Sequence, residues 1–440
     1  MNTITLHPTK TPLTGTLQVP GDKSISHRAI IFSALSEQKI RIQNLLEGED
    51  VLCTIDCFRK MGVCIEKQGD EWRVQGVGLR GLKQPSEILY CGNSGTTTRL
   101  LMGILAAQNF ESKLSGDASL NKRPMKRVME PLSQMGAQFS VEGEGTAHRI
   151  ITVKGGHLKG IDYTSPVASA QVKTALLLAG LWAEGETSVT EPSLSRDHTE
   201  RILRAVMCVE ADSLKVSIQA VQKITLPELW KIPGDFSSAA FFIVAASIVP
   251  GSEILIPDVN LNPTRSAAAG VLKKMGAKIS FEKESLLAGE EMGDIRVSFA
   301  PLHATPIQGE IIPWLIDEIP ILCIAASQAE GETIISDAAE LRVKESDRIE
   351  VMCNLLSQLG VSVEEIKDGL KIKGKALLKG ARVQSFLDHR IAMSMAIAAW
   401  VADGPMTIEG VESVLTSFPG FWEIVRYFSS KPNNYSTKAY

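Results

Sequence analysis

The chain contains two kinds of segment. Some are nearly apolar throughout, and in others apolar and polar residues alternate. Six segments are rich in Ala, Leu, Ile and Met and are apolar around their whole circumference, which is typical of buried helices. They begin at His27, Thr97, Gln171, Ser238, Glu318 and His389. A small or acidic turn and a short strand usually follow, as in Thr187–Pro192 and Met406–Val411. The pattern therefore predicts a helix–strand unit that occurs six times.

A second pattern recurs roughly every seventy residues: the end of an amphipathic helix, a glycine, and a strand of alternating polarity. In each full copy the glycine follows the last helical turn, where a left-handed residue closes a helix. The full copies are Phe58–Glu66, Leu132–Glu142, Leu272–Glu282 and Leu356–Glu365, and a degenerate copy begins at Leu203. Both patterns together predict six similar structural units.

The segments Val19–Ser26 and Ile232–Ala239 both enter an apolar helix through Pro-Gly-Asp. We interpret them as the two places where the chain passes between halves. Residues 22–232 would then form a first globular domain of three repeats, and residues 1–21 plus 233–440 a second. A length of 440 residues also favours more than one domain.

Composition excludes several classes of protein. A formal net charge of −4, from 46 basic and 50 acidic residues, argues against a nucleic-acid or membrane-surface binder. Seven cysteines are scattered singly, and the first ten residues lack the apolar core of a signal peptide, so we expect a cytoplasmic protein with reduced thiols. Metal-ligand spacings and a Rossmann fingerprint are missing, so we expect neither a metal nor another cofactor.

The residues just before the six apolar segments carry hydroxyl, amide or carboxylate groups, which are good helix N-caps. These stretches are Asp22, Asn93–Thr96, Ser165–Ser169, Asp235–Ser238, Asp317–Glu318 and Asp388. Capping does not explain Lys23, Arg28, Arg99 and Arg390, because the helix dipole opposes a cation near the N-terminus. An anion bound at the helix starts would explain them, and several cations indicate a ligand with more than one negative group.

Three charged clusters have simpler interpretations when each is taken alone. Asn121–Arg127 would be a solvated loop unless it faces the anion. Ser195–Arg201 would start a helix, with exposed charges beyond its cap, and Glu340–Glu350 would be an exposed helix of alternating charge. Gly92–Arg99 lacks the Gly-Lys-Ser/Thr ending of a nucleotide P-loop, so we exclude ATP or GTP there.

Taken together, the motifs resemble those of a known family. In chain order they are GDKSISHRA, GNSGTTTR, KRPM, SAQVKTALLLAG, SRDHTE, LIDEIP, RVKESDRI, DHRIAM and SFPGF. They are similar to the signature segments of the 5-enolpyruvylshikimate-3-phosphate synthase family, from about Pro20 to Phe421. The resemblance implies a two-domain inside-out α/β barrel of six βαβαββ-type repeats, three per domain, with the active site in the cleft between the domains.

The resemblance also implies an activity: the enolpyruvyl group of phosphoenolpyruvate moves to the 5-hydroxyl of shikimate 3-phosphate, and phosphate leaves. The route is addition followed by elimination, in the shikimate pathway. The implied partners are these two small molecules, with no nucleic acid, membrane or cofactor, and the protein would be a cytoplasmic monomer.

The resemblance further implies residue roles. Asp317 would take the hydroxyl proton, Glu345 would protonate the methylene carbon, and Lys23 would assist either step. The residues implied for shikimate 3-phosphate are Lys23, Ser24, Arg28, Ser169, Gln171, Arg196, Asp317 and Lys344. Those implied for phosphoenolpyruvate are Lys23, Gly95, Arg123, Gln171, Arg348 and Arg390. The chain departs from the family pattern at Ala170, where other members have serine, at Thr416, where many have lysine, and in lacking a tyrosine near Arg196.

Two alternative functions stay open. One is the enolpyruvyl transferase that acts on UDP-N-acetylglucosamine, which typically has a cysteine in the loop that corresponds to Gly116–Arg127; here that loop has none. The other is a catalytically silent anion-binding scaffold, against which the joint presence of Lys23, Asp317 and Glu345 argues.

Overall fold

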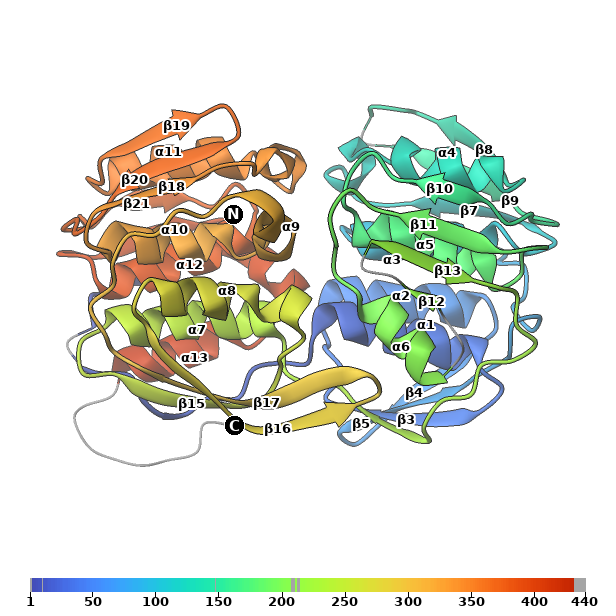
Figure 1. Cartoon of the computed structure of the whole chain (residues 1–440), viewed down its shortest axis with the longest axis horizontal. Coiled ribbons are helices and arrows are strands. Elements are labelled where there is room, and N and C mark those ends of the chain that lie inside the picture. The colour runs from blue at the N-terminus through green and yellow to red at the C-terminus, as the bar shows by residue number, and fades with distance from the viewer. Residues whose placement is uncertain (1, 10, 147, 207–209, 212–213, 431–440) are drawn as a thin grey trace. The chain divides into compact units, whose positions relative to one another are not determined.

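The computed structural model describes residues 2–9, 11–146, 148–206, 210–211 and 214–430. The chain divides into two units (Figure 1). The first unit comprises Gly21–Ile232 and Leu287–Glu290, and the second comprises Met1–Pro20, Pro233–Leu286 and Glu291–Tyr440. Within the described part of the chain, no helix combines the length and the apolar character that a bilayer span requires.

In the first unit, the described strands form three sheets of four strands, and each sheet contains one parallel pair. The first sheet, β14-β3-β5-β4, consists of Leu229–Lys231, Lys39–Gln43, Glu71–Gln75 and Cys64–Gln68. The second, β6-β7-β9-β8, consists of Leu89–Tyr90, Glu111–Ser115, Ile150–Lys154 and Gln138–Glu142. The third, β10-β11-β13-β12, consists of Asp162–Thr164, Thr187–Thr190, Lys215–Ile218 and Glu210–Ala211.

Three helices of the first unit are buried over most of their length, as their apolar circumference predicted: α1 (Lys23–Leu35), α3 (Gly95–Leu105) and α5 (Ala170–Gly180). Their side chains form much of the core of this unit. The other helices combine buried and polar positions: α2 (Glu49–Lys60), α4 (Lys126–Gln134), α6 (His198–Val206) and the 3-10 turn η1 (Leu120–Lys122). Burial of the apolar helices is what fixes their N-terminal ends in place.

The second unit is built from similar parts. Its sheets have the orders β16-β17-β15-β2, β18-β20-β19 and β1-β22-β21. The first sheet consists, in that order, of Lys278–Leu287, Glu290–Ser298, Glu253–Asn260 and Thr14–Thr16. The second consists of Glu332–Ile335, Gly369–Lys373 and Val363–Ile366. The third consists of Thr3–Leu6, Met406–Glu409 and Arg382–Gln384. In Figure 1 the strands β18–β20 and β15–β17 lie on opposite sides of the helices of this unit.

The three predicted apolar helices of the second unit are also confirmed. They are α7 (Phe236–Ile248), α10 (Ile319–Gln328) and α12 (His389–Trp400), and every residue of α7 and α12 is buried. The remaining helices are α8 (Pro263–Lys274), α9 (Ile312–Leu315), α11 (Arg348–Gln358), α13 (Phe421–Ser430) and the 3-10 turns η2 (Gly309–Ile311), η3 (Ala339–Val343) and η4 (Val411–Thr416). This unit has a core cluster of its own.

The glycine pattern is confirmed in its four full copies. Gly62, Gly136, Gly276 and Gly360 have φ angles of 90°, 116°, 100° and 86°, and a strand follows each. These angles lie in the region that glycine enters without strain. For the degenerate copy, α6 ends at Val206, whereas residues 207–209 and 212–213 lie outside the described residues.

Predicted N-caps are confirmed at five of the six apolar helices. The capping side chains that accept a backbone N–H bond are Asp22, Ser94, Ser169, Asp235 and Asp388. The cap prediction is wrong at α10, where Glu318 flanks the helix without such a bond. Pro320 stands in the first turn of α10 and has no N–H to donate. The Glu318 carboxylate accepts a hydrogen bond from the Ser237 hydroxyl instead.

The tip of the β16–β17 hairpin, Leu287–Glu290, groups with the first unit. There the Oε1 atom of Glu290 lies 2.8 Å from Nδ1 of buried His198. The division of the sequence at the two Pro-Gly-Asp segments did not anticipate this tip, because nothing in its local composition marks a change of unit.

Candidate active site

In the first unit, Arg28 of α1 is held by uncharged oxygen atoms. Its Nε donates to Thr199 Oγ1 at 2.8 Å, its Nη2 to Thr174 Oγ1 at 2.9 Å and its Nη1 to the Ser24 carbonyl at 3.0 Å. Burial lowers the pKa of Arg28, while the carboxylates of Glu200 and Asp22 act in the opposite direction. A buried guanidinium that bonds hydroxyl and carbonyl oxygens keeps its positive charge for a ligand.

The start of α3 gathers the side chains of two arginines around Gly95. A Cβ atom added at Gly95 would lie 2.9 Å from Nη1 of Arg99 and 3.5 Å from Nη1 of Arg123. Arg123 donates a hydrogen bond to the Asn93 side-chain oxygen. The backbone amides of this helix start and two guanidinium groups therefore lie together, which is a suitable environment for a phosphate or carboxylate.

Gln171, at the start of α5, links this group to the next helix. Its Oε1 accepts a hydrogen bond from Arg99, and its Nε2 donates to Thr96 Oγ1 at 3.0 Å. The sequence interpretation noted Arg99 as a cation near a helix start but gave it no ligand. Its placement between Gly95 and Gln171 adds it to the candidate site.

The remaining predicted residues of the first unit lie at helix starts as well. Ser169 caps α5, and its backbone N–H donates to Glu191 Oε1 at 2.8 Å. Lys23, the first residue of α1, places Nζ 2.9 Å from Asp50 Oδ2. Arg196 lies in the turn that precedes α6.

In the second unit, Arg348 brings the two predicted proton-transfer residues together. This side chain is 1% exposed. Its Nη2 lies 2.7 Å from Glu345 Oε2, its Nη1 3.5 Å from Asp317 Oδ1, and its Nε 2.8 Å from Asp388 Oδ2. These carboxylates raise the pKa of Arg348 against the opposing effect of burial. One fixed cation therefore orients both candidate carboxylates.

Arg390 contacts the same group from the start of α12. Its Nη1 donates to the Asp317 carbonyl at 3.1 Å, and its Nε lies 3.7 Å from Asp317 Oδ1. Its Nη1 also lies 3.7 Å from Oε1 of Glu318, which is equally far from Nη1 of Arg265. Arg265 in turn contacts Asp235 Oδ1 at 2.9 Å. Arginines and carboxylates thus alternate across the helix starts of this unit.

Lys344 lies beside these carboxylates, with Nζ 3.7 Å from Glu340 Oε1. Burial lowers its pKa, and the charges of Asp317 and Glu340 act in the opposite direction. A lysine with a lowered pKa exchanges its proton closer to neutral pH than an exposed lysine does, which suits an acid–base role.

Two charged clusters differ from their simplest interpretations. In Ser195–Arg201 the prediction of exposed charges beyond the cap is wrong, because His198 and Glu200 are buried. In Glu340–Glu350 the prediction of one exposed helix is wrong: η3 ends at Val343, and Asp347 caps a new helix, α11. Residues distant in the sequence pair with these charges in the interior, and a local sequence pattern cannot reveal such partners. The third cluster supplies Arg123 to the α3 start, so it is more than a solvated loop.

The fold has a counterpart among solved structures even where the sequences are distant. The enolpyruvyl transferase NikO from Streptomyces tendae matches with a TM-score of 0.76 over 96% of both chains at 16% identity, which shows the fold alone. The chain therefore has a mixed α/β fold that it shares with an enolpyruvyl transferase.

Closer matches identify the family. The model of the family described as EPSP synthase (3-phosphoshikimate 1-carboxyvinyltransferase) matches residues 8–425. A 3-phosphoshikimate 1-carboxyvinyltransferase from Bacillus licheniformis is 50% identical over 95% of this chain and 98% of its own length. The EPSP synthase structure from Acinetobacter baumannii matches with a TM-score of 0.87 at 46% identity, over 97% of this chain and 98% of the other. The chain belongs to the EPSP synthase family, which confirms the resemblance of its motifs.

Proposed function

We propose that the residues gathered at the helix starts of the two units carry out the reaction of this family. The chain is a 3-phosphoshikimate 1-carboxyvinyltransferase, an enzyme of the shikimate pathway to aromatic amino acids, and its substrates are phosphoenolpyruvate and shikimate 3-phosphate. The roles of individual residues are our proposal.

The observation that carries these roles is the position of Arg348 between Asp317 and Glu345. Two proton transfers are needed in the addition step. The 5-hydroxyl of shikimate 3-phosphate loses a proton as its oxygen bonds to C2 of phosphoenolpyruvate, and the methylene carbon C3 gains a proton. We assign the first transfer to Asp317 and the second to Glu345, with Lys23 able to assist either.

Elimination reverses the second transfer: C3 loses a proton, the C2–O bond to phosphate breaks, and the double bond forms again. Negative charge then develops on the leaving phosphate. We assign Arg123, Arg348 and Arg390 to the phosphate and carboxylate of phosphoenolpyruvate, together with Lys23, Gly95 and Gln171. Preformed cations are suited to this task because they need no reorientation as charge develops.

For shikimate 3-phosphate we assign Lys23, Ser24, Arg28, Ser169, Gln171 and Arg196 in the first unit, and Asp317 and Lys344 in the second. Support comes from Arg28, whose guanidinium bonds the Ser24 carbonyl in the first turn of α1, and from Ser169, which caps α5. We assign no ligand to Ala170 or Thr416, the two positions that depart from the family pattern. The Thr416 hydroxyl donates a hydrogen bond to the Ser413 carbonyl.

The finer architecture is a proposal as well: an inside-out barrel of six βαβαββ-type repeats, three in residues 22–232 and three in residues 1–21 plus 233–440. The three described sheets in each unit support it. The cleft between the domains stays a prediction. So do a monomeric state and a place in the cytoplasm.

An assay of phosphate release tests the proposed function. Phosphoenolpyruvate is supplied with shikimate 3-phosphate or, as the matched control, with UDP-N-acetylglucosamine. Release with the first acceptor and only background with the second supports the proposal. Release with the second acceptor alone contradicts it.

A further inference from the structure

We propose that Glu191 is a positioning residue that holds Ser169 and the Ser195–Arg196 turn in the geometry needed to bind the phosphate of shikimate 3-phosphate. The inference rests on the proposed function, in which Ser169 and Arg196 bind shikimate 3-phosphate. The family motifs gave Glu191 no role in the sequence interpretation.

Glu191 follows strand β11 and is 3% exposed. Its Oε1 accepts a hydrogen bond from the backbone N–H of Ser169 at 2.8 Å. Its Oε2 accepts from the backbone N–H of Ser195 at 3.2 Å and from the Ser195 hydroxyl at 2.8 Å. One buried carboxylate therefore joins the turn before α5 to the turn before α6.

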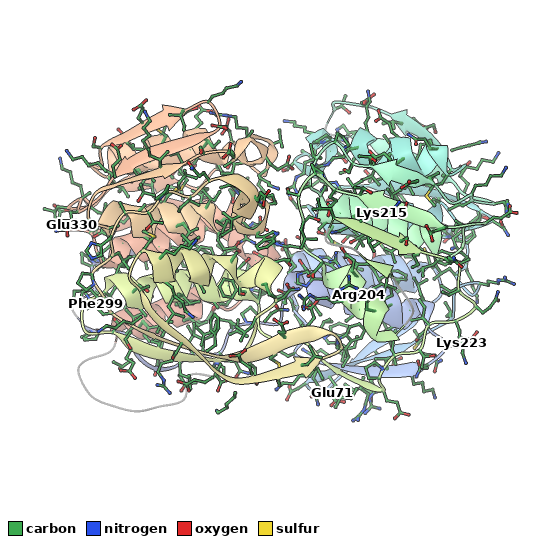
Figure 2. All side chains as sticks on the ribbon, in the orientation of Figure 1. Glu71, Arg204, Lys215, Lys223, Phe299 and Glu330 are labelled. Atoms are coloured by element: carbon green, nitrogen blue, oxygen red, sulfur yellow. The ribbon has the colours of Figure 1, made fainter. Side chains whose placement is uncertain are left out.

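A third contact fixes the carboxylate itself. Nζ of Lys173, in α5, lies 2.6 Å from Oε2 of Glu191 and also 2.6 Å from Oε1 of Glu200, in α6. All three side chains are buried. By contrast, Lys215, which is labelled in Figure 2, pairs with Asp162 at 3.2 Å on the surface. Exposed pairs stabilise little, whereas a buried group that loses its partner is strongly unfavourable.

The donors around Glu191 match the two acceptor oxygens of a carboxylate. Four donor groups converge on it: two backbone amides, one hydroxyl and one ammonium. A carboxylate offers two acceptor oxygens and no donor, whereas an amide offers one oxygen and an NH₂ group. Glutamine at position 191 would therefore turn its NH₂ toward the Ser195 amide and the Lys173 ammonium, or toward the Ser169 amide.

The consequence for function is specific to one substrate. Ser169 and Arg196 lie on separate turns, so their spacing depends on what joins the turns. Displacement of binding groups by about 1 Å is enough to weaken a charge-assisted contact substantially. Glu191 should therefore affect shikimate 3-phosphate, while phosphoenolpyruvate, assigned to other residues, is affected little.

Glu200 provides a matched control. It contacts the same ammonium as Glu191 does, and Glu200→Gln removes the same charge from the same ion cluster. The Glu200 side chain accepts a hydrogen bond from Lys173, and this contact joins helix α6 to helix α5 rather than joining the two turns. Burial raises the pKa of Glu200, while Lys173 acts in the opposite direction.

The experiment compares steady-state kinetics of the full-length variants Glu191→Gln and Glu200→Gln. For Glu191→Gln we expect KM for shikimate 3-phosphate to rise about tenfold to a hundredfold, as loss of a hydrogen bond to a charged group implies. KM for phosphoenolpyruvate and kcat should change by less than about threefold. Glu200→Gln should not raise KM for shikimate 3-phosphate by more than about twofold, because it removes a negative charge near Arg28 and breaks no bond to either turn.

Equal changes of both KM values in both variants would overturn the inference, because they would indicate a merely structural ion cluster. Arg196→Gln separates this failure from failure of the site assignment. If KM for shikimate 3-phosphate rises in Arg196→Gln but not in Glu191→Gln, positioning by Glu191 is refuted and the assignment stands. If KM for shikimate 3-phosphate rises in neither variant, both the positioning role of Glu191 and the site assignment are refuted.

Ser195→Ala keeps the inference testable if Glu191→Gln does not fold. It deletes only the hydroxyl bond to Oε2 of Glu191 and retains every charge. We expect KM for shikimate 3-phosphate to rise about threefold, as loss of one ordinary hydrogen bond implies. An unchanged KM in a folded Ser195→Ala protein would overturn the inference.

Discussion

The two units hold their buried arginines in different ways. In the first unit, Arg28 donates to hydroxyl and carbonyl oxygens. In the second, Arg348 contacts three carboxylates and Arg265 contacts Asp235. Neutral acceptors fix the direction of a guanidinium and leave its charge for a ligand, whereas carboxylates offset that charge. We propose that this difference suits Arg28 to ligand binding and Arg348 to the orientation of the candidate proton-transfer carboxylates.

The largest expected effect comes from Glu345→Gln, which keeps the shape of the side chain and removes its capacity for proton transfer. We expect kcat to fall about 10²–10⁴-fold, the typical contribution of a general acid or base. Single-turnover kinetics at saturating substrate measure this without interference from product release. A kcat within about threefold of wild type would contradict the assignment of proton transfer to this part of the second unit.

Arg348→Met should lower the free energy of unfolding, in addition to its effect on activity. Removal of the guanidinium leaves Asp388, which is 0% exposed, without this cation, and breaking a buried ion pair on one side costs about 3–5 kcal/mol. Urea unfolding gives the change. The control is Arg342→Met, which breaks the partly exposed pairs with Asp347 and Glu365 and should cost about 1 kcal/mol or less. Similar losses of unfolding free energy in both variants would contradict the claim that the buried pair of Arg348 with Asp388 stabilises more than the partly exposed pairs of Arg342.

A smaller effect concerns pH and His27 of α1. Burial lowers the pKa of His27 well below its usual value, and the positive charges of Lys23 and Arg28 lower it further. The unfolded chain therefore binds a proton below about pH 6.5 that the folded chain does not. Folding stability should decrease as pH falls below that value, with a slope from this group of up to about 1.4 kcal/mol per pH unit.

Urea unfolding between pH 7 and 5 measures this slope, and His27→Gln should reduce it because glutamine does not titrate. An unchanged slope in His27→Gln would contradict this account, because other groups would then be the source of the slope.

Much of the fold could be predicted because local physics determines it. Segments that are apolar on all sides can only be buried, and a glycine after an amphipathic turn closes the helix. All six apolar helices and the four helix-closing glycines follow from these rules.

The candidate site could be predicted only where motifs or charges at helix starts marked it. Lys173 stands in an otherwise apolar helix, which is a sign that a buried counter-charge must exist, but nothing local identifies Glu191 and Glu200 as its partners. The pairing of Arg348 with Asp388 likewise joins positions forty residues apart. Such contacts depend on tertiary packing, which periodicity along the chain does not encode.

The proposal that Arg28 binds shikimate 3-phosphate while Glu345 transfers a proton is tested most directly by calorimetric titration. Shikimate 3-phosphate is titrated, without phosphoenolpyruvate, into wild type, Arg28→Met and Glu345→Gln. We predict affinity at least about tenfold weaker for Arg28→Met, and within about twofold of wild type for Glu345→Gln. Equal weakening in both variants, or weakening in Glu345→Gln alone, would contradict it.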